Sequence, residues 1–221
     1  MTKIAVIYYS ATGNTYQVAQ AVDEGAKQAG AETRLRKVRE LAPAEAIASN
    51  QGWKEHAQAT ADIPEATLDD LDWADGFLFG TPTRYGALSA QLKQFLDTSG
   101  PLWAQGKLAN KAVGAFVGAG NAHGGQETTL LTIYNVMYHW GAIIVPTGYT
   151  DPVLYAAGGN PYGTSYATPQ QGGVPEEILT AACYQGGRVA RFAAVFAANA
   201  AQLVPTPQEA QQGAAAAGGQ G

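Results

Sequence analysis

The chain has 221 residues and a net charge of −5, and 46% of its residues are hydrophobic, which is enough for one α/β domain with insertions. Its basic residues are scattered, which does not favour nucleic-acid binding, and no apolar run approaches the length of a membrane span or of a signal peptide. Cys183 is the only cysteine, so no intramolecular disulfide can form and we expect a reducing, cytoplasmic location. Within its alanine-rich helical segment, Cys183 is interpreted as a small core residue.

Apolar runs and helical spacings alternate along the chain. The spacing predicts strands at 3–9, 32–38, 75–80, 111–118 and 142–146, and helices at 14–29, 88–97, 126–139 and 176–198. Such an alternation is typical of a parallel sheet with right-handed crossovers and helices on both faces. The runs at 75–80 and 111–118 are almost continuously apolar or small, as expected of strands that are buried on both faces.

Three segments do not fit this alternation. Residues 39–72 contain prolines and an acidic run, and we expect a helical or irregular excursion there. Residues 147–175 are rich in Gly, Pro and Tyr and too long for a plain connector, which predicts a surface loop with a binding or assembly role. The low-complexity sequence from about residue 202 cannot bury a core. We therefore divide the chain into one domain, 1–200, and a disordered tail, 201–221.

The most informative segment joins the first predicted strand to the first predicted helix. Its hydroxyl groups belong to Ser10, Thr12 and Thr15, Gly13 permits close approach of the backbone, and the helix start supplies free N–H groups. This combination predicts a site for a phosphate monoester. A nucleoside triphosphate fits poorly, because no lysine follows before Lys27. The simpler alternative is an ordinary strand–turn–helix junction with a Ser or Thr cap.

Two further loops follow predicted strands, and the carboxyl ends of parallel strands share one edge of a sheet. One reads TPTRYGALS at 81–89 and the other GAGNAHGGQE at 118–127. Together with the first loop, they offer a phosphate site, main-chain groups for the edge of a ring, and Tyr85 to cover its face. A flat heteroaromatic ring with a phosphate tail would use all three loops.

Several motifs carry a family resemblance. YYSATGNT at 8–15, GTPTRYG at 80–86, GPLW at 100–103, GGQE at 124–127, HWG at 139–141 and VPTGY at 145–149 resemble the WrbA family of flavodoxin-like NAD(P)H:quinone oxidoreductases. The resemblance covers residues 1–200. It implies a flavodoxin-like three-layer α/β sandwich with a five-stranded parallel sheet in the order 2-1-3-4-5. It also implies FMN as cofactor, NADH or NADPH as electron donor, two-electron ping-pong reduction of quinones, and a homotetramer.

The resemblance also assigns roles to individual residues. The positions that match the FMN phosphate loop are Ser10, Thr12, Gly13, Asn14 and Thr15. The positions that match the loop beside the isoalloxazine ring are Thr81, Pro82, Thr83, Arg84 and Tyr85. The positions that match the third flavin loop are Ala119, Gly120, Ala122, His123 and Gly124. His139 matches a histidine at the flavin site, and Trp103 matches a wall of the substrate pocket.

Three departures from the family pattern stand out. Thr12 replaces a common aromatic residue that would stack on the nicotinamide dinucleotide. Ala87 replaces a common asparagine, and the third loop is one residue longer, so the assignments at 121–123 could shift by one.

Alternative roles remain open for several of these residues. Arg84 adds positive charge at the flavin, or binds solvent or a neighbouring subunit. His139 donates a proton or hydrogen bond to the quinone, or is a structural residue at a helix end. Trp103 is a pocket wall, or a core or interface anchor. His56 and the acidic stretch 62–75 are interpreted as solvated surface, and no zinc-type cluster of ligands occurs in the sequence.

The function also has alternatives at this stage. The first is a flavodoxin-type one-electron carrier for protein partners. The second is a regulatory or scaffold protein with a vestigial flavin site. The modest acidity of the chain and the long 147–175 segment favour the oxidoreductase over the carrier.

Overall fold

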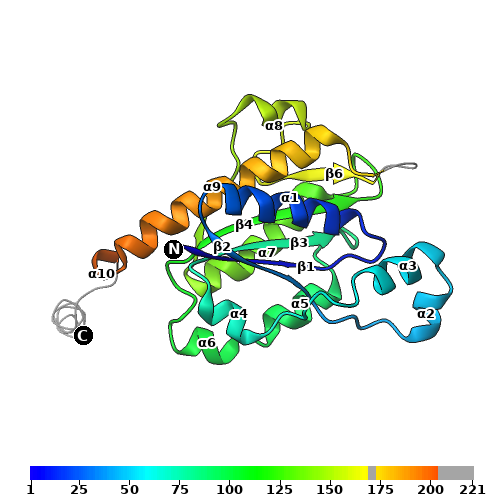
Figure 1. The fold of residues 1–221 in the computed structure, drawn as a ribbon, viewed down its shortest axis with the longest axis horizontal. Coiled ribbons are helices and arrows are strands. Elements are labelled where there is room, and N and C mark those ends of the chain that lie inside the picture. Colours follow the sequence, from blue (N-terminus) through cyan, green and yellow to red (C-terminus); the bar gives the residue numbers. More distant parts are fainter. Residues whose placement is uncertain (169–172, 204–221) are drawn as a thin grey trace, which may run out of the picture.

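In the computed structural model, which describes residues 1–168 and 173–203, parallel strands follow the order β2-β1-β3-β4-β5 (Figure 1). Their bounds are Lys3–Tyr8 for β1, Glu32–Lys37 for β2, Gly76–Pro82 for β3, Ala112–Ala119 for β4 and Ile143–Ile144 for β5. The predicted flavodoxin-like order 2-1-3-4-5 is thereby confirmed.

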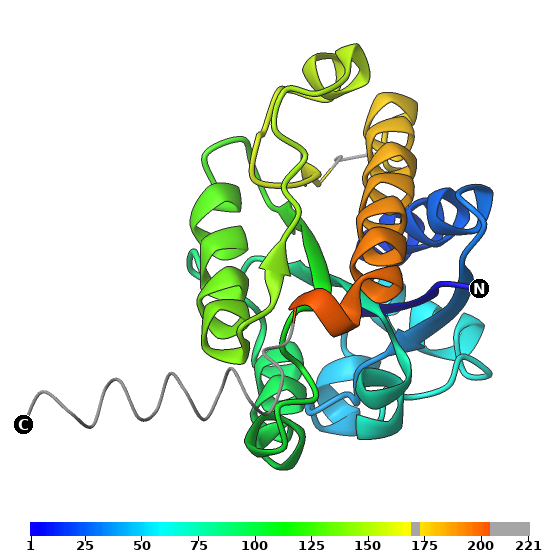
Figure 2. The ribbon, with the colours of Figure 1, turned by 90° about the vertical axis from the view of Figure 1, so that its left-hand side faces the viewer.

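Helices cover both faces of this sheet. One layer holds α1 (Asn14–Gln28) and α9 (Glu176–Ala198), and the other holds α4 (Leu68–Trp73), α5 (Ala90–Asp97), α6 (Gly100–Ala104) and α7 (Gln126–Trp140). Figure 2 shows α7 in green and α9 in orange on opposite sides of the strands. The layers follow from strand alternation: along β1, Ala5 packs toward the α7 side and Val6 toward the α9 side.

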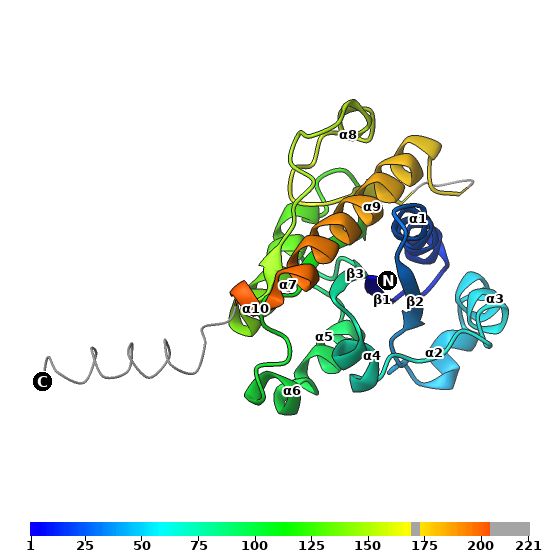
Figure 3. The ribbon, with the colours of Figure 1, turned by 60° about the vertical axis from the view of Figure 1, so that its left-hand side comes forward.

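The excursion predicted at 39–72 is helical. It contains α2 (Ala44–Ala48) and α3 (Gln51–Ala59) before α4, and Figure 3 shows α2 and α3 beside β2, outside the main layers. Glu40 links this excursion to the sheet through hydrogen bonds. Its carboxylate accepts five hydrogen bonds, from Tyr9 Oη, Trp53 Nε1, Gln91 Nε2 and two backbone N–H groups.

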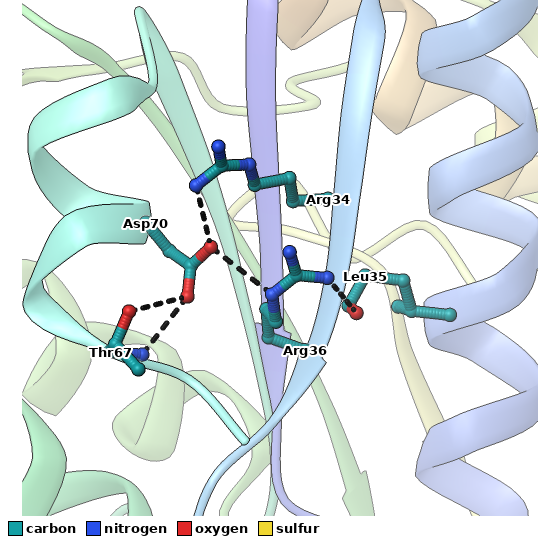
Figure 4. Close-up of polar contacts among 5 residues, drawn as sticks. All are labelled: Arg34, Leu35, Arg36, Thr67 and Asp70. Carbon is teal, nitrogen blue, oxygen red and sulfur yellow. Dashed lines mark hydrogen bonds and ion pairs between the residues drawn. The ribbon is translucent and has the colours of Figure 1, made fainter. Parts of the chain in front are cut away.

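Asp70 joins α4 to the edge strand β2 (Figure 4). Its Oδ2 accepts hydrogen bonds from the backbone N–H and hydroxyl of Thr67, which closes a capping box at the start of α4. Its Oδ1 accepts from Arg34 Nη1 and Arg36 Nε, each at 3.1 Å. Asp70 is 2% exposed, so the interpretation of the acidic stretch 62–75 as solvated surface is wrong at this residue.

The described part of the predicted surface loop at 147–175 contains regular structure. Residues 147–168 include α8 (Pro152–Ala156) and β6 (Ser165–Ala167), and β6 pairs in parallel with β4 at Val117–Ala119. The structure therefore adds a sixth strand to the five predicted ones. The strand predicted at 142–146 is reduced to β5, and β6 pairs with the carboxyl-terminal part of β4 instead.

The other boundaries agree with the spacing, including the last long helix at 176–198. In the predicted tail, residues 201–203 belong to the short helix α10 (Ala200–Leu203), and 204–221 lie outside the described residues. Among the described helices, none is long and apolar enough to cross a membrane.

Candidate functional site

The first loop connects β1 to α1 and is built to receive an anion. Ser10 Oγ accepts a hydrogen bond from the Gly13 N–H at 3.1 Å, which folds the loop back on itself. Gly13 has φ +100° and precedes α1, and no side chain caps this helix. The N–H groups of the first helical turn are thus left for a ligand, at the positive end of the helix dipole.

A small cavity of about 130 Å3 lies against this loop. Its polar lining comes from Ser10, Thr12, Asn14, Thr15, Arg84, Tyr166 and Thr168. Thr15 and Tyr166 fix each other, since their hydroxyl oxygens lie 3.1 Å apart in the interior. Burial raises the pKa of Tyr166 to about 12, so its hydroxyl is neutral at pH 7. The cavity thus offers neutral donors and one arginine, which suits a phosphate monoester.

The second loop follows β3, and its residues differ in burial. Thr81 is fully buried. Its hydroxyl lies 2.9 Å from both Ser89 Oγ and the Pro82 carbonyl oxygen, so its hydrogen bonds are made within the protein. Thr83 Oγ1 lies 2.6 Å from Thr129 Oγ1. Tyr85 has φ +54° and is fully exposed, so its ring is free to cover a ligand.

The third loop runs from β4 to α7. Ala119 is buried, Ala122 and His123 are exposed, and the His123 N–H donates to Asn121 Oδ1 at 2.9 Å. A second cavity of about 360 Å3 lies between this loop and the second one. It shares Pro82, Arg84, Gly118 and Thr168 with the cavity beside the first loop, which we call the phosphate-sized cavity.

The two adjoining cavities together fit a flat body with an anionic tail, which is the shape of FMN. The first holds the free N–H groups and hydroxyls that a phosphate needs, and the second is bounded mainly by main-chain and small residues that a ring can approach. Arg84 lines both cavities and is the single cation among the described residues that line either. Among residues 1–168 and 173–203, no three His, Cys, Asp or Glu side chains gather as metal ligands.

Comparison with known proteins agrees with this geometry. The family described as NADPH-dependent FMN reductase matches residues 2–151. An NAD(P)H dehydrogenase (quinone) from Deinococcus radiodurans is 50% identical over 163 residues, which are 74% of this chain and 82% of the relative. Another from Sinorhizobium fredii is 40% identical and covers 89% of this chain and 100% of the relative. The chain belongs to the NAD(P)H dehydrogenase (quinone) family.

Solved structures with a flavodoxin-like fold are similar to this chain. A flavodoxin, WrbA-like protein from Agrobacterium tumefaciens is 25% identical, with a TM-score of 0.64 and coverage of 88% of this chain and 99% of that one. The predicted resemblance to the WrbA family is confirmed. The fold alone would not decide the function, since the flavodiiron protein from Giardia intestinalis shares it at 17% identity and a TM-score of 0.57, with coverage of 89% of this chain and 37% of that one.

His139 and Trp103 do not join the three loops within one chain. His139 is exposed in the last turn of α7, and Trp103 Nε1 donates to the His139 carbonyl oxygen at 2.8 Å. The flavin loops lie at the first turn of α7, about 20 Å away at 1.5 Å per helical residue. The pair therefore sits at the opposite edge of the sheet, where β4 begins.

The structure also contains site residues that sequence reasoning missed. Tyr166 and Thr168 reach the phosphate-sized cavity from β6, and only the unusual length and tyrosine content of 147–175 hinted at them. His56 was interpreted as solvated surface, which is wrong. It is half-buried behind the first loop, where a Cβ at Gly13 would lie 3.4 Å from its Nδ1. Burial, and secondly the charge of Lys37, lowers the pKa of His56.

Proposed function

We propose that this protein is an FMN-dependent NAD(P)H:quinone oxidoreductase that reduces quinones to hydroquinones in a two-electron, ping-pong cycle. The observation that carries the proposal is the pair of adjoining cavities at the carboxyl ends of β1, β3 and β4. Family membership supports the same activity. When bound, FMN supplies the redox chemistry, accepting a hydride from NADH or NADPH and passing two electrons to the quinone.

The residues of the chain bind and orient the cofactor. The first-turn N–H groups of α1, with Ser10, Thr12, Asn14 and Thr15, hold its phosphate. The main chain of the second and third loops holds the ring edge, with Pro82, Thr83, Tyr85, Ala119, Gly120, Ala122, His123 and Gly124 around it. Arg84 places positive charge beside both cavities, which favours the anionic phosphate and negative charge that develops on the ring.

The substrate side of the site needs a second copy of the chain, and we propose a homotetramer. Trp103 is 55% exposed and His139 is exposed beside it, so both side chains are available to a neighbour. In this arrangement His139 donates a proton or hydrogen bond to the quinone oxygen, and Trp103 closes the pocket against water. A cytoplasmic location fits a protein that has one cysteine and consumes reduced nicotinamide dinucleotide.

Cofactor titration and turnover test the function together. FMN at one hundred times its Kd should raise the free energy of unfolding by about 2.7 kcal/mol. Riboflavin, which lacks the phosphate, should stabilise much less. Thr15→Ala should weaken FMN binding by about 1 kcal/mol through the lost hydroxyl.

The loaded protein should oxidise NADH or NADPH rapidly with benzoquinone. Slow turnover despite tight FMN binding would favour the one-electron carrier instead. Equal stabilisation by FMN and riboflavin would contradict the phosphate assignment.

A further inference from the structure

A larger cavity lies behind the third loop, between it and the segment that leads into β6. Its volume is about 510 Å3, within the range of roughly 300–1,000 Å3 that small-molecule sites occupy. Ala122 of the third loop forms part of its wall, and Tyr166 borders both this cavity and the phosphate-sized one. The cavity therefore adjoins the flavin loops, with Tyr166 as the shared wall.

The walls of this cavity suit a flat ring. Tyr149 and Tyr162 are 57% and 40% exposed, and both line the cavity. Tyr149 stacks on Tyr155 with ring centroids 5.4 Å apart, which fixes the orientation of the Tyr149 ring. Aliphatic surface from Ala157 and Ile178 completes this side. Aromatic rings of this kind bind planar groups by stacking.

The charged group of the cavity is the exposed carboxylate of Glu127, and the hydroxyls of Tyr149, Tyr162 and Ser165 can both donate and accept. A carboxylate requires donors on the ligand. A quinone offers only carbonyl oxygens, whereas adenosine offers an amino group and ribose hydroxyls.

The charge of the lining separates the two nicotinamide dinucleotides. Glu127 is the only charged residue in the described lining, and the undescribed segments 169–172 and 204–221 contain no lysine or arginine. A carboxylate near the adenosine ribose accepts a hydrogen bond from its 2′-hydroxyl, as in NAD-binding folds, and it repels a 2′-phosphate, which requires a cation.

We propose that this cavity receives the adenosine half of the nicotinamide dinucleotide and that Glu127 makes the protein prefer NADH to NADPH. The inference rests on the proposed function, in which the dinucleotide is the electron donor. Glu127 accepts from the ribose hydroxyls, and the adenine ring lies against Tyr149 and Tyr162. Tyr149 and Tyr162 thereby replace the aromatic contact that Thr12 cannot make.

Two nucleotide fragments test this proposal by calorimetry on the FMN-loaded protein. The fragments are 5′-AMP and adenosine 2′,5′-bisphosphate, which differ only in the 2′-phosphate. The wild type should bind 5′-AMP at least tenfold more tightly. Glu127→Gln should abolish the discrimination, and Glu127→Lys should reverse it. Glu45→Gln, which removes an exposed carboxylate from the first turn of α2, should change neither affinity.

A second pair of variants tests the ring site. Tyr149→Ala should weaken both fragments by the same factor, about fivefold or more, whereas Tyr138→Ala, an exposed tyrosine at the far end of α7, should not. The kcat/KM ratio of NADH to NADPH should follow the fragment ratio through the Glu127 series.

The inference is overturned if the wild type binds neither fragment or binds both equally, or if Glu127→Lys leaves their ratio unchanged. Neither fragment carries a nicotinamide, so their binding is measured independently of quinone reduction. Rapid quinone turnover without fragment binding would remove this inference and leave the proposed function standing.

Discussion

Two aspartates of α4, two positions apart, show how burial changes the value of an ion pair. Asp70 is buried and shared by Arg34 and Arg36, whereas Asp72 forms an exposed pair with Lys107. Burial alone would raise the pKa of Asp70, but the Thr67 hydrogen bonds and the two guanidinium groups outweigh it and lower the pKa below its usual value. Asp70 is therefore the carboxylate that holds α4 on β2.

Asp70→Asn should lower the free energy of unfolding by about 2 kcal/mol at pH 7, because charged hydrogen bonds from two arginines are lost. Urea denaturation measures the difference. Asp72→Asn is the matched control and should change stability little, because exposed pairs contribute little.

The same carboxylate predicts a pH dependence. Its pKa is lower in the folded state, so its contribution is fully present above its ordinary pKa of about 4 and is lost as the pH falls below it. The stability gap between wild type and Asp70→Asn should narrow between about pH 4 and pH 2. A constant gap over that range would contradict the assignment.

Helices α1 and α9 pack through their backbones. A Cβ at Gly186 of α9 would overlap the Val22 carbonyl oxygen of α1, and a Cβ at Gly25 of α1 would overlap the Cys183 carbonyl oxygen of α9. The prediction of Cys183 as a core residue is wrong. Its side chain is half-buried at the rim of this helix contact, with Sγ 3.6 Å from Gln28 Oε1.

Gly186→Ala should therefore destabilise the protein by about 2–3 kcal/mol, because the backbones must separate to admit the methyl group. Gly52→Ala is the matched control. Its Cβ would meet only Asn50 Oδ1, at 3.6 Å, so the substitution should stabilise α3 by up to about 1 kcal/mol. Thermal unfolding of both variants measures the two effects, and equal shifts of the midpoint temperature would contradict the close packing.

At the scale of the whole molecule, the proposed site residues lie at two opposite edges of one sheet. The flavin loops occupy the carboxyl edge, and Trp103 and His139 occupy the opposite one. No motion within a single domain brings these edges together, because the packed sheet lies between them. In the proposed homotetramer, another copy of the chain supplies the second edge.

Sedimentation should give about four times the chain mass of 23.0 kDa. Thr15→Asp, which places a carboxylate in the phosphate cavity, and His139→Ala should each reduce quinone turnover. Co-expressed in one oligomer, they should recover more activity than the separately purified variants give together. Recovery is expected because one copy supplies the flavin loops and another supplies His139. No recovery in verified mixed oligomers would contradict the shared site.

Local signals determined much of this protein from its sequence alone. The alternation of strands and helices and the strand–turn–helix junction at 10–15 were predictable, because contiguous residues build them: apolar runs, three hydroxyls, a glycine and a helix start. The strand order came from the resemblance to the WrbA family. Glu40 was not singled out, although it accepts five hydrogen bonds, because its partners come from distant elements.

Only the tertiary structure decided which distant residues complete the site. Thr15 meets Tyr166 across 151 positions, because β6 adds to the sheet beside β4, and no local spacing encodes that pairing. His56 reaches Gly13 for the same kind of reason, through the excursion that Glu40 fastens. His139 lies far from the loops because α7 spans the whole sheet, and the two ends of α7 lie at opposite edges.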